Sequence, residues 1–403
     1  MPRKSLLSSE PGIGDVLSMC LLVNIFPVAL IRKTLAETGK MSLKERDFPN
    51  HLAFYFVIFM AFFARSSYDA LIEKLVAGLE LILRVEERYK VLNKSSVSRA
   101  RERLGWEPFA NVFAKIVKPI STKGTKGAWF HGLRTVILDG VSFKLTDTPE
   151  NGKHFGYSEN EKGRGAFPVA HAVLLAESAT HVAFGLSIGT AKRKGELQLA
   201  SDLLYLLKKG MLVLCDRFYP SYSFLKAVRA TGAHVLWRVK SDFKLEPEEI
   251  LPDGSFISRL HEYRDSPKSK GGHRTGSSIA VRVVKYRVKG IKSDGPCRII
   301  TSLLDPDEFN AEELGAYYHE RWEVENLNDE LKVHLKAPEL PLRSKSPDMV
   351  LQEIWGFLLA HFVIRKSIHE AALRLDEDPD LLSFKGAVEV IQERLPHAGA
   401  FSP

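Results

Sequence analysis

Two aspartates directly follow short apolar runs that have the composition of buried strands. Asp139 comes after Val136-Ile-Leu138, and Asp216 comes after Met211-Leu-Val-Leu-Cys215. The end of a strand is a common place for a catalytic side chain, because a rigid sheet aims it into a cleft. An aspartate after a strand is also an ordinary turn former or helix cap. Taken singly, each aspartate is more simply explained as structural.

A third acidic residue belongs to a polar stripe on a helix predicted from about Asn310 to Lys336. At about 100° per residue, four polar side chains fall within a sector roughly 60° wide, opposite an apolar face. These four are Tyr318, Arg321, Glu325 and Lys332. Arg321 and Glu325 alone could be a solvated i,i+4 pair, worth a few tenths of a kcal/mol. That explanation gives no reason for Tyr318 and Lys332 to share the stripe.

The stripe carries a family resemblance. The spacing Tyr318-x2-Arg321-x3-Glu325-x6-Lys332 resembles the YREK signature of the insertion element 4 family of DDE transposases. Segments elsewhere are similar to the same family, from about Leu17 to Arg365. They are Asp139-Gly140 with Asp147-Thr-Pro-Glu-Asn151, Asp216-Arg217-Phe-Tyr-Pro-Ser221, Leu342-Arg-Ser-Lys-Ser-Pro347 through Glu353, and Ser95 to Gly105. Val141 and Phe218 depart from the residues common there, but neither departure removes a catalytic group.

The resemblance implies an α/β architecture. A ribonuclease-H-like catalytic domain would be interrupted by a β-rich insertion, with an all-helical N-terminal DNA-binding domain and a helical C-terminal tail. Asp139, Asp216 and Glu325 would then meet in space and hold two Mg²⁺ ions, for which Mn²⁺ can substitute. Such ions suit hard oxygen ligands and assist in-line phosphoryl displacement. Tyr318, Arg321 and Lys332 would grip phosphates of the transposon end.

The function implied is that of a DNA transposase of an insertion sequence. It would bind terminal inverted repeats and catalyse metal-dependent strand cleavage and strand transfer, in cut-and-paste transposition. Its partners would be double-stranded DNA, both transposon ends and target, and a second copy of the chain in a synaptic complex. Such a protein would work in the bacterial cytosol, in association with the nucleoid.

The elements that must position these residues begin with a helical region. Residues 13–119 are predicted to be mainly helical, and Lys94 to Arg103 reads as a helix with Ser95 or Ser96 as its N-cap. Three arginines follow the cap: Arg99, Arg101 and Arg103. Such a helix could be the recognition helix of a helix-turn-helix, in which arginine reads guanine edges. A solvated amphipathic helix explains the segment equally well.

Strands and helices alternate after a linker at Lys123 to Gly127. Strand-like runs are predicted at 136–138, 142–145, 167–188, 211–215 and 234–239, with helices at 195–209 and 218–229. This alternation indicates an α/β or mixed-sheet domain. Strand-like patterns return at 279–288 and 298–304, and further helices are predicted at 349–373 and 382–395.

The segment from Arg264 to Arg298 is strongly basic, with ten basic and two acidic residues. Because it lacks a helical pattern, Arg282, Lys285 and Arg287 are expected to contact phosphates and to carry little sequence information. The patterns together predict five segments. They are a helical N-terminal DNA-binding domain at 1–122, the first part of the catalytic domain at 129–242, the basic β-rich insertion at 243–304, the second part of the catalytic domain with the YREK helix at 305–372, and an acidic helical tail at 373–403.

Composition and charge agree with a polyanionic partner. The net charge is +8 over 403 residues, and residues 347–403 hold five basic against nine acidic residues, which leaves +12 for the remainder. The longest apolar run, Leu52 to Ala64, has 13 residues, against roughly 20 needed to span a membrane. It therefore predicts a buried helix, and no membrane partner is expected. The three cysteines form no CxxC pair, which fits a reducing cytosol.

Two other functions compete with transposition. A transposase-derived DNA-binding protein that has lost catalysis would share the fold, but the retention of all three acids and the whole stripe disfavours it. A structure-selective nuclease of ribonuclease-H-like fold would explain the acids but not the long insertion.

Overall fold

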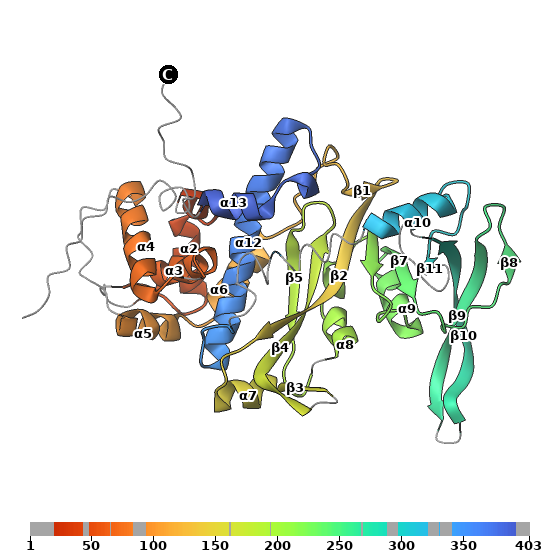
Figure 1. The fold of residues 1–403 in the computed structure, drawn as a ribbon, viewed down its shortest axis with the longest axis horizontal. Coiled ribbons are helices and arrows are strands. Elements are labelled where there is room, and N and C mark those ends of the chain that lie inside the picture. The colour runs from red at the N-terminus through yellow and green to blue at the C-terminus, as the bar shows by residue number, and fades with distance from the viewer. Residues whose placement is uncertain are drawn as a thin grey trace, which may run out of the picture.

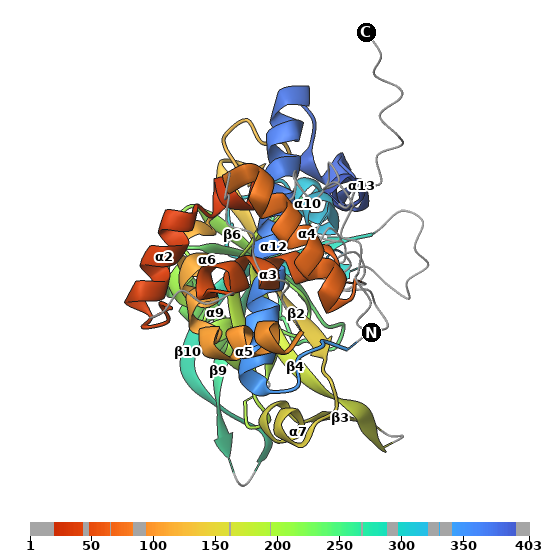
Figure 2. The same cartoon turned by 90° about the vertical axis from the view of Figure 1, so that its left-hand side faces the viewer.

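The computed structural model describes residues 20–42, 48–64, 66–83, 94–160, 163–193, 195–266, 269–287, 297–320, 330 and 341–391. A group of N-terminal helices lies at one end of the molecule and a mixed sheet occupies the middle and the other end (Figure 1). The long helix α12, Pro347–Leu375, runs between the helical group and the sheet. A view onto the helical end shows the N-terminal helices in front of α12 (Figure 2).

The N-terminal helices confirm the helical prediction for the part of 13–119 that is described. Their bounds are α2 Val28–Glu37, α3 Asn50–Phe62, α4 Tyr68–Leu83, α5 Lys94–Leu104 and α6 Glu107–Ile116. Every residue of α3 except His51 is buried, as expected for an apolar helix packed on all sides. Within the described ranges, no helix is both long enough and apolar enough to cross a membrane.

The sheet is continuous and mixed. Its strands are β1 Trp129–Phe130, β2 Leu133–Lys144, β3 Tyr157–Asn160, β4 Gly163–Glu177, β5 Ala183–Ile188, β6 Met211–Cys215, β7 His234–Val239, β8 Glu249–Ile250, β9 Phe256–Ser266, β10 Ser269–Tyr286 and β11 Cys297–Thr301. The spatial order is β3-β4-β2-β6-β7-β11-β10-β9-β8, with β5 paired to β4 and β1 to β2. β6 runs parallel to both β2 and β7, whereas β4 is antiparallel to β2 and β5.

Short helices connect the strands and a helical segment closes the chain. They are α7 Pro149–Phe155, α8 Glu196–Ser201, the 3₁₀ turn η1 Leu204–Leu206, α9 Tyr222–Ala230, α10 Ala311–Glu320, the 3₁₀ turn η3 Pro379–Leu381 and α13 Phe384–Ile391. The helix predicted at 218–229 begins later, at Tyr222, because the Ser221 side chain accepts from the Phe224 amide as an N-cap. The helix predicted at 349–373 is confirmed as α12.

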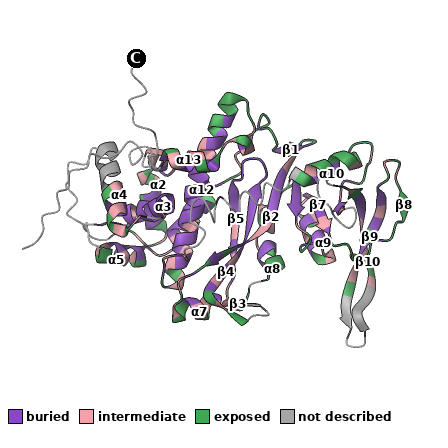
Figure 3. Cartoon of the chain, in the orientation of Figure 1, coloured by how far each residue is buried: buried purple, intermediate pink, exposed green. Residues whose placement is uncertain are grey.

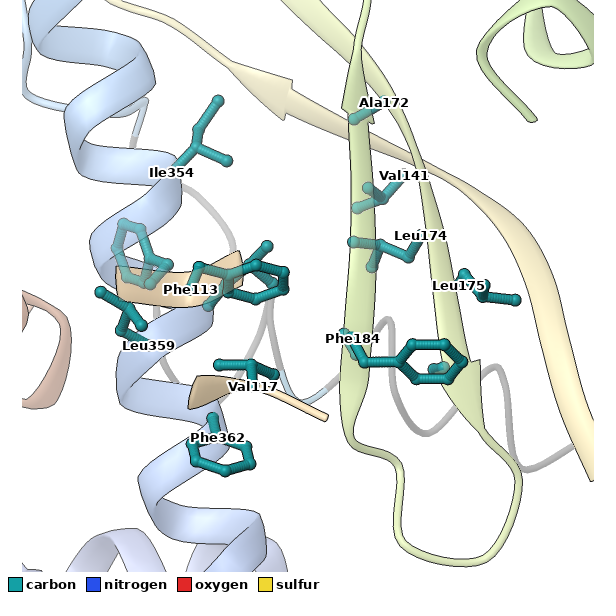
Figure 4. Packing of buried hydrophobic residues seen from close by; sticks show 14 of the residues in the cluster. Phe113, Val117, Val141, Ala172, Leu174, Leu175, Phe184, Ile354, Leu359 and Phe362 are labelled. Atoms are coloured by element: carbon teal, nitrogen blue, oxygen red, sulfur yellow. The ribbon is translucent and has the colours of Figure 1, made fainter. Parts of the chain in front are cut away.

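The core joins α12 to the sheet. Buried residues fill the sheet, α3 and the middle of α12, and exposed residues collect on the outer helices (Figure 3). Ile354 and Phe362 of α12, with Phe113 of α6, face Val141 and Leu174 on the sheet (Figure 4). The N-terminal helices and the sheet therefore share one apolar interior.

One strand differs from the prediction in a way that matters for the site. The sequence predicted a break at Asp139-Gly140, but β2 continues through both residues, which pair with Leu174 and Val173 of β4. The parallel pairing of β2 with β6, however, ends just before Asp139. Its last pair is Leu138 with Cys215.

Candidate active site

The two predicted catalytic aspartates are brought together by the register of β2 and β6. Asp139 and Asp216 each stand one residue beyond the last parallel pair, Leu138 with Cys215. Neighbouring strands lie about 4.8 Å apart, so residues at one level of two paired strands are adjacent. Both aspartates are partly exposed. The Asp216 carboxylate also accepts the Arg217 amide at 2.5 Å, which fixes its orientation as the chain leaves β6.

A further carboxylate, Glu196 of α8, lies over this pair and was not predicted from the sequence. A Cβ atom built on Gly140 would stand 2.5 Å from Oε1 of Glu196. Burial raises the pKa of Glu196, and the negative charge of Asp216 raises it further. Glu196 follows a glycine at the start of a short helix, and nothing in that local pattern distinguishes it from an ordinary first-turn acid.

Tyr219 forms the buried floor beside these acids. Its hydroxyl is buried and has no hydrogen-bond partner among the described residues. Burial raises the pKa of this hydroxyl, and negative charge on Cys215, Glu196 and the two aspartates adds to the effect. A buried hydroxyl without a partner beside acidic side chains suggests that a bound water is needed here. A water in the hydration shell of a cation could supply the missing hydrogen bond.

The described acids fit part of a divalent-cation site. Asp139 and Asp216 offer hard oxygen ligands of the kind that Mg²⁺ and Mn²⁺ prefer. Among the residues that the structure describes, no three His, Cys, Asp or Glu side chains stand close enough to hold an ion. The predicted third acid, Glu325, lies outside the described residues, as do Arg321 and Lys332.

Tyr318, the first residue of the stripe, packs inside the protein. Its side chain is 3% exposed and its hydroxyl donates to the Cys215 carbonyl at 3.1 Å, one residue before Asp216. The neighbouring Tyr317 hydroxyl lies 2.6 Å from that of Thr135 on β2. These two tyrosines attach α10 to both strands that carry the aspartates. The predicted phosphate contact of Tyr318 is not met in this conformation, because its hydroxyl faces the sheet.

The arginines of α5 divide into two kinds. Arg101 is fully buried and donates to Gln352 at 2.9 Å, Tyr68 at 2.6 Å and Ser344 at 3.1 Å, so its predicted DNA contact is wrong. The reason is helical periodicity, because Arg101 shares the buried face of α5 with Val97, Ala100 and Leu104. Arg99 is exposed, and Arg103 is half-buried and reaches the Phe48 carbonyl at 3.5 Å.

The basic residues of β10 divide in the same way. Arg282 is fully buried, where it donates to the Asp253 carboxylate, to Ser255 at 2.8 Å and to the Phe309 carbonyl at 2.6 Å. Its predicted phosphate contact is therefore wrong, because Arg282 lies on the same face of β10 as Val284, and the segment that contains Phe309 covers that face. Lys285 and Arg287 are exposed, and the Lys285 ammonium lies 5.5 Å from the centre of the Phe256 ring.

A second exposed basic group lies next to Asp216 and was missed by the sequence analysis. Phe218 is 57% exposed, with the Arg217 guanidinium 5.5 Å and the Lys240 ammonium 5.0 Å from its ring centre. An exposed aromatic ring between two cations is a surface suited to a nucleic acid strand. Arg217 directly follows Asp216 in the sequence and could have been noticed there. Lys240 directly follows the C-terminal end of β7, and no sequence pattern connects it with Asp216.

Comparison with known proteins identifies the family of the chain. Residues 130–363 match the family described as the Transposase DDE domain, and residues 16–114 match the insertion element 4 transposase N-terminal family. The chain therefore belongs to the DDE transposases, in the insertion element 4 family. It is an insertion-sequence transposase, an enzyme that cleaves DNA and transfers strands in a reaction that depends on divalent cations.

Two curated relatives come from Escherichia coli strain K12. The chain is 29% identical over 377 residues to the transposase InsG for insertion sequence element IS4, covering 93% of this chain and 82% of the relative. It is 22% identical over 244 residues to the putative transposase InsZ, covering 59% of this chain and 78% of that protein.

Proposed function

We propose that Asp139, Asp216 and Glu325 form one catalytic centre at which this transposase cuts and joins DNA strands. The observation that supports it most is the β2–β6 register, which sets the first two acids side by side although 77 positions separate them in the chain. Divalent cations held there, Mg²⁺ by preference and Mn²⁺ as a substitute, would activate the attacking oxygen and stabilise the leaving one.

The chain itself supplies the rigid positions that this chemistry needs. Pairing with β4 holds Asp139 within a long strand, and the Arg217 amide orients Asp216. The Tyr318 hydroxyl holds the carbonyl that precedes Asp216. A side chain supported in this way loses little freedom when the reacting groups assemble, which lowers the entropic part of the barrier.

The catalytic domain is proposed to be ribonuclease-H-like. This rests on the strand order β5-β4-β2-β6-β7, with antiparallel neighbours on one side of β2 and parallel strands on the other. Residues 243–304 would be its insertion. The division into 1–122, 129–242, 243–304, 305–372 and 373–403 is kept as a proposal.

Exposed cations would bind the DNA. Arg99, Lys285 and Arg287 keep their proposed DNA contacts because they are exposed, and Arg217 with Lys240 joins them beside the acids. Arg321 and Lys332 keep the phosphate contacts proposed from their spacing. The substrates would be the terminal inverted repeats and the target, and two copies of the chain would act together in a synaptic complex of the cut-and-paste reaction.

Alanine substitution tests the proposal directly. Asp139→Ala, Asp216→Ala and Glu325→Ala should each abolish strand cleavage, whereas binding to end DNA should persist, because phosphates repel carboxylates in the absence of cations. An excess of chelator should have the same effect on the unaltered protein. Cleavage of a labelled end fragment and its mobility shift measure the two activities.

Asp307 provides the control, since it is an exposed acid in the loop between β11 and α10. Asp307→Ala should cleave like the unaltered protein. Undiminished cleavage by any of the three test variants, or in excess chelator, would exclude the proposed centre.

A further inference from the structure

Glu330 is a buried acid five residues after Glu325 in the sequence, and the proposed chemistry does not use it. It is 4% exposed, although a carboxylate is rarely buried unless other groups neutralise and hydrogen-bond it.

Three basic side chains surround the Glu330 carboxylate. Arg365 donates to both of its oxygens, through Nε to Oε2 at 2.8 Å and through Nη2 to Oε1. His361 Nε2 lies 2.9 Å from Oε2, and His181 Nδ1 lies 3.0 Å from Oε1. Each carboxylate oxygen thus lies within 3.0 Å of two nitrogen atoms. We call these four residues the Glu330 anchor.

The anchor connects parts of the chain that are far apart in sequence. His181 is in the turn between β4 and β5, whereas His361 and Arg365 are in α12. Asp380 of η3 closes the outer side, with its Oδ1 3.2 Å from His181 Nε2. The Phe384 ring of α13 lies 5.4 Å from both the Arg365 guanidinium and the His361 ring.

Electrostatics make Arg365 the principal counter-charge. Burial lowers the pKa of His361 to about 3, so this ring is neutral at physiological pH. Burial also lowers the pKa of His181, with further lowering by Arg365 and His361. Because Arg365 Nη2 also donates to His181 Nδ1, the proton of the neutral His181 ring belongs on Nε2, facing Asp380.

A buried ion pair of this kind is weak evidence for stability, since well-packed apolar residues often do as well. It does specify position, because three donors, two from Arg365 and one from His361, fit the two oxygens of one carboxylate at one place. Five residues of chain reach at most about 17 Å, and an α-helix of five residues rises only about 7.5 Å along its axis. Fixing Glu330 therefore confines Glu325.

We propose that the Glu330 anchor is a positioning device that holds Glu325 at the metal site. The inference rests on the proposed function, because it takes Glu325 as the third acid. Glu330 itself would touch neither metal nor DNA. Loss of the anchor would loosen the metal site while leaving Asp139 and Asp216 in place, since the β2–β6 register holds them independently.

Mn²⁺ binding, measured by titration calorimetry on the full chain without DNA, tests the proposal. Glu330→Gln keeps the shape and removes the charge, and we expect it to weaken Mn²⁺ binding by about tenfold, the lower end of what residues supporting metal ligands contribute. In a Glu325→Gln background, adding Glu330→Gln should change Mn²⁺ affinity by less than about twofold, because its effect passes through Glu325.

Glu353→Gln is the matched control, because Glu353 is also 4% exposed and accepts hydrogen bonds from Ser344 near the N-terminal end of α12. It should lower stability without changing Mn²⁺ affinity. His361→Leu removes one donor, leaves Arg365 in place and serves as the milder variant if Glu330→Gln fails to fold. It should weaken Mn²⁺ binding less than Glu330→Gln, but measurably.

The outcomes separate the two claims. Equal losses of affinity from Glu330→Gln with and without Glu325, or no loss from either anchor variant, would overturn the anchor and leave the proposed function intact. Mn²⁺ binding that is unaffected by Asp139→Ala and by Glu325→Gln would instead overturn the proposed function, and the role of Glu330 with it.

Discussion

The acidic residues next to the last β2–β6 pair repel one another. Asp139, Asp216 and Glu196 bring negative charge into one small region, and Gly140 leaves the space that the Glu196 carboxylate occupies. Without cations such a group is electrostatically costly, because like charges at short distance repel strongly in a partly buried site. Cation binding there would relieve the cost, so metal affinity and the instability of the metal-free site would have a common origin.

Glu196→Gln should reveal this cost in metal-free protein. Burial, and then the charge of Asp216, raise the pKa of Glu196 above its ordinary value of 4.5. The folded chain therefore binds this proton more tightly than the unfolded chain, and stability falls as pH rises through and above 4.5. We expect the variant to be more stable than the unaltered protein near pH 7.5, with the difference shrinking toward about pH 4.5. Denaturant unfolding in chelator measures it, and a pH-independent difference would contradict the expectation.

The sequence pointed to candidate acids but not to their surroundings. Asp139 and Asp216 could be found because apolar runs end at them, and the resemblance pointed to Glu325. Arg101 was misassigned because its charge was given more weight than its place on the buried face of α5. Glu196 was missed, since its closeness to Gly140 depends on how α8 packs on the sheet, which local pattern does not determine.

At the scale of elements, polar contacts join helices to β2 and to the end of β6, which position Asp139 and Asp216. Tyr317 and Tyr318 attach α10 to β2 and to the end of β6, and the Glu330 anchor joins its own segment to α12 and the β4–β5 turn. Polar attachments of this kind fix register, whereas apolar packing tolerates sliding. The position of each attachment would therefore affect the geometry of the acids.

Acid should weaken the attachment through His361. Its pKa in the fold is about 3, against 6.5 ordinarily, so the unfolded chain takes up a proton first as pH falls. Stability from this group is lost below about pH 6.5, by up to about 1.4 kcal/mol per pH unit. His361→Gln should lose less stability than the unaltered protein between about pH 7 and pH 5.5, as measured by urea unfolding. Equal losses in both proteins would show that His361 does not titrate in this way.

The sequence largely predicted which segments form helices and which form strands, but it did not predict how the strands pair. Periodicity indicated the buried helix α3, the helix α12 and most strands, because each needs only local sequence. The continuity of β2 through Asp139-Gly140 could not be foreseen, since it arises from pairing with β4 about 35 residues later. Likewise, nothing local indicated that the strands of 243–304 would join the catalytic sheet.

At the scale of the whole molecule, α12 couples the N-terminal helices to the sheet. Gly356 allows its closest approach, because a Cβ atom there would stand 2.7 Å from Cγ1 of Val57 and 3.3 Å from the Val57 carbonyl oxygen. Arg101 adds polar contacts from α5 to Gln352 of the same helix. A rigid connection of this kind would transmit the position of DNA bound by the helical region to the catalytic acids.

Gly356→Ala should weaken this junction. Overpacking costs about 1–3 kcal/mol, offset by up to about 1 kcal/mol of helix propensity gained over glycine, so we expect a net loss. Gly386→Ala in α13 is the control, because its nearest atoms, in Ser383, are 3.4 Å away. The control should be neutral or slightly stabilising. Chemical unfolding compares the two, and equal effects would show that α12 shifts to accept the methyl group without cost.

The pairing of β11 with β7 gives residues 243–304 a second role, which is independent of any charge they carry. Through this pairing β11 covers the outer edge of β7, the last strand of the parallel set. A shortened protein that lacked 243–304 would expose a row of unpaired backbone donors and acceptors there, and such a row invites strands from other molecules to add to it. Removal of these residues should therefore promote aggregation, whatever it does to DNA binding.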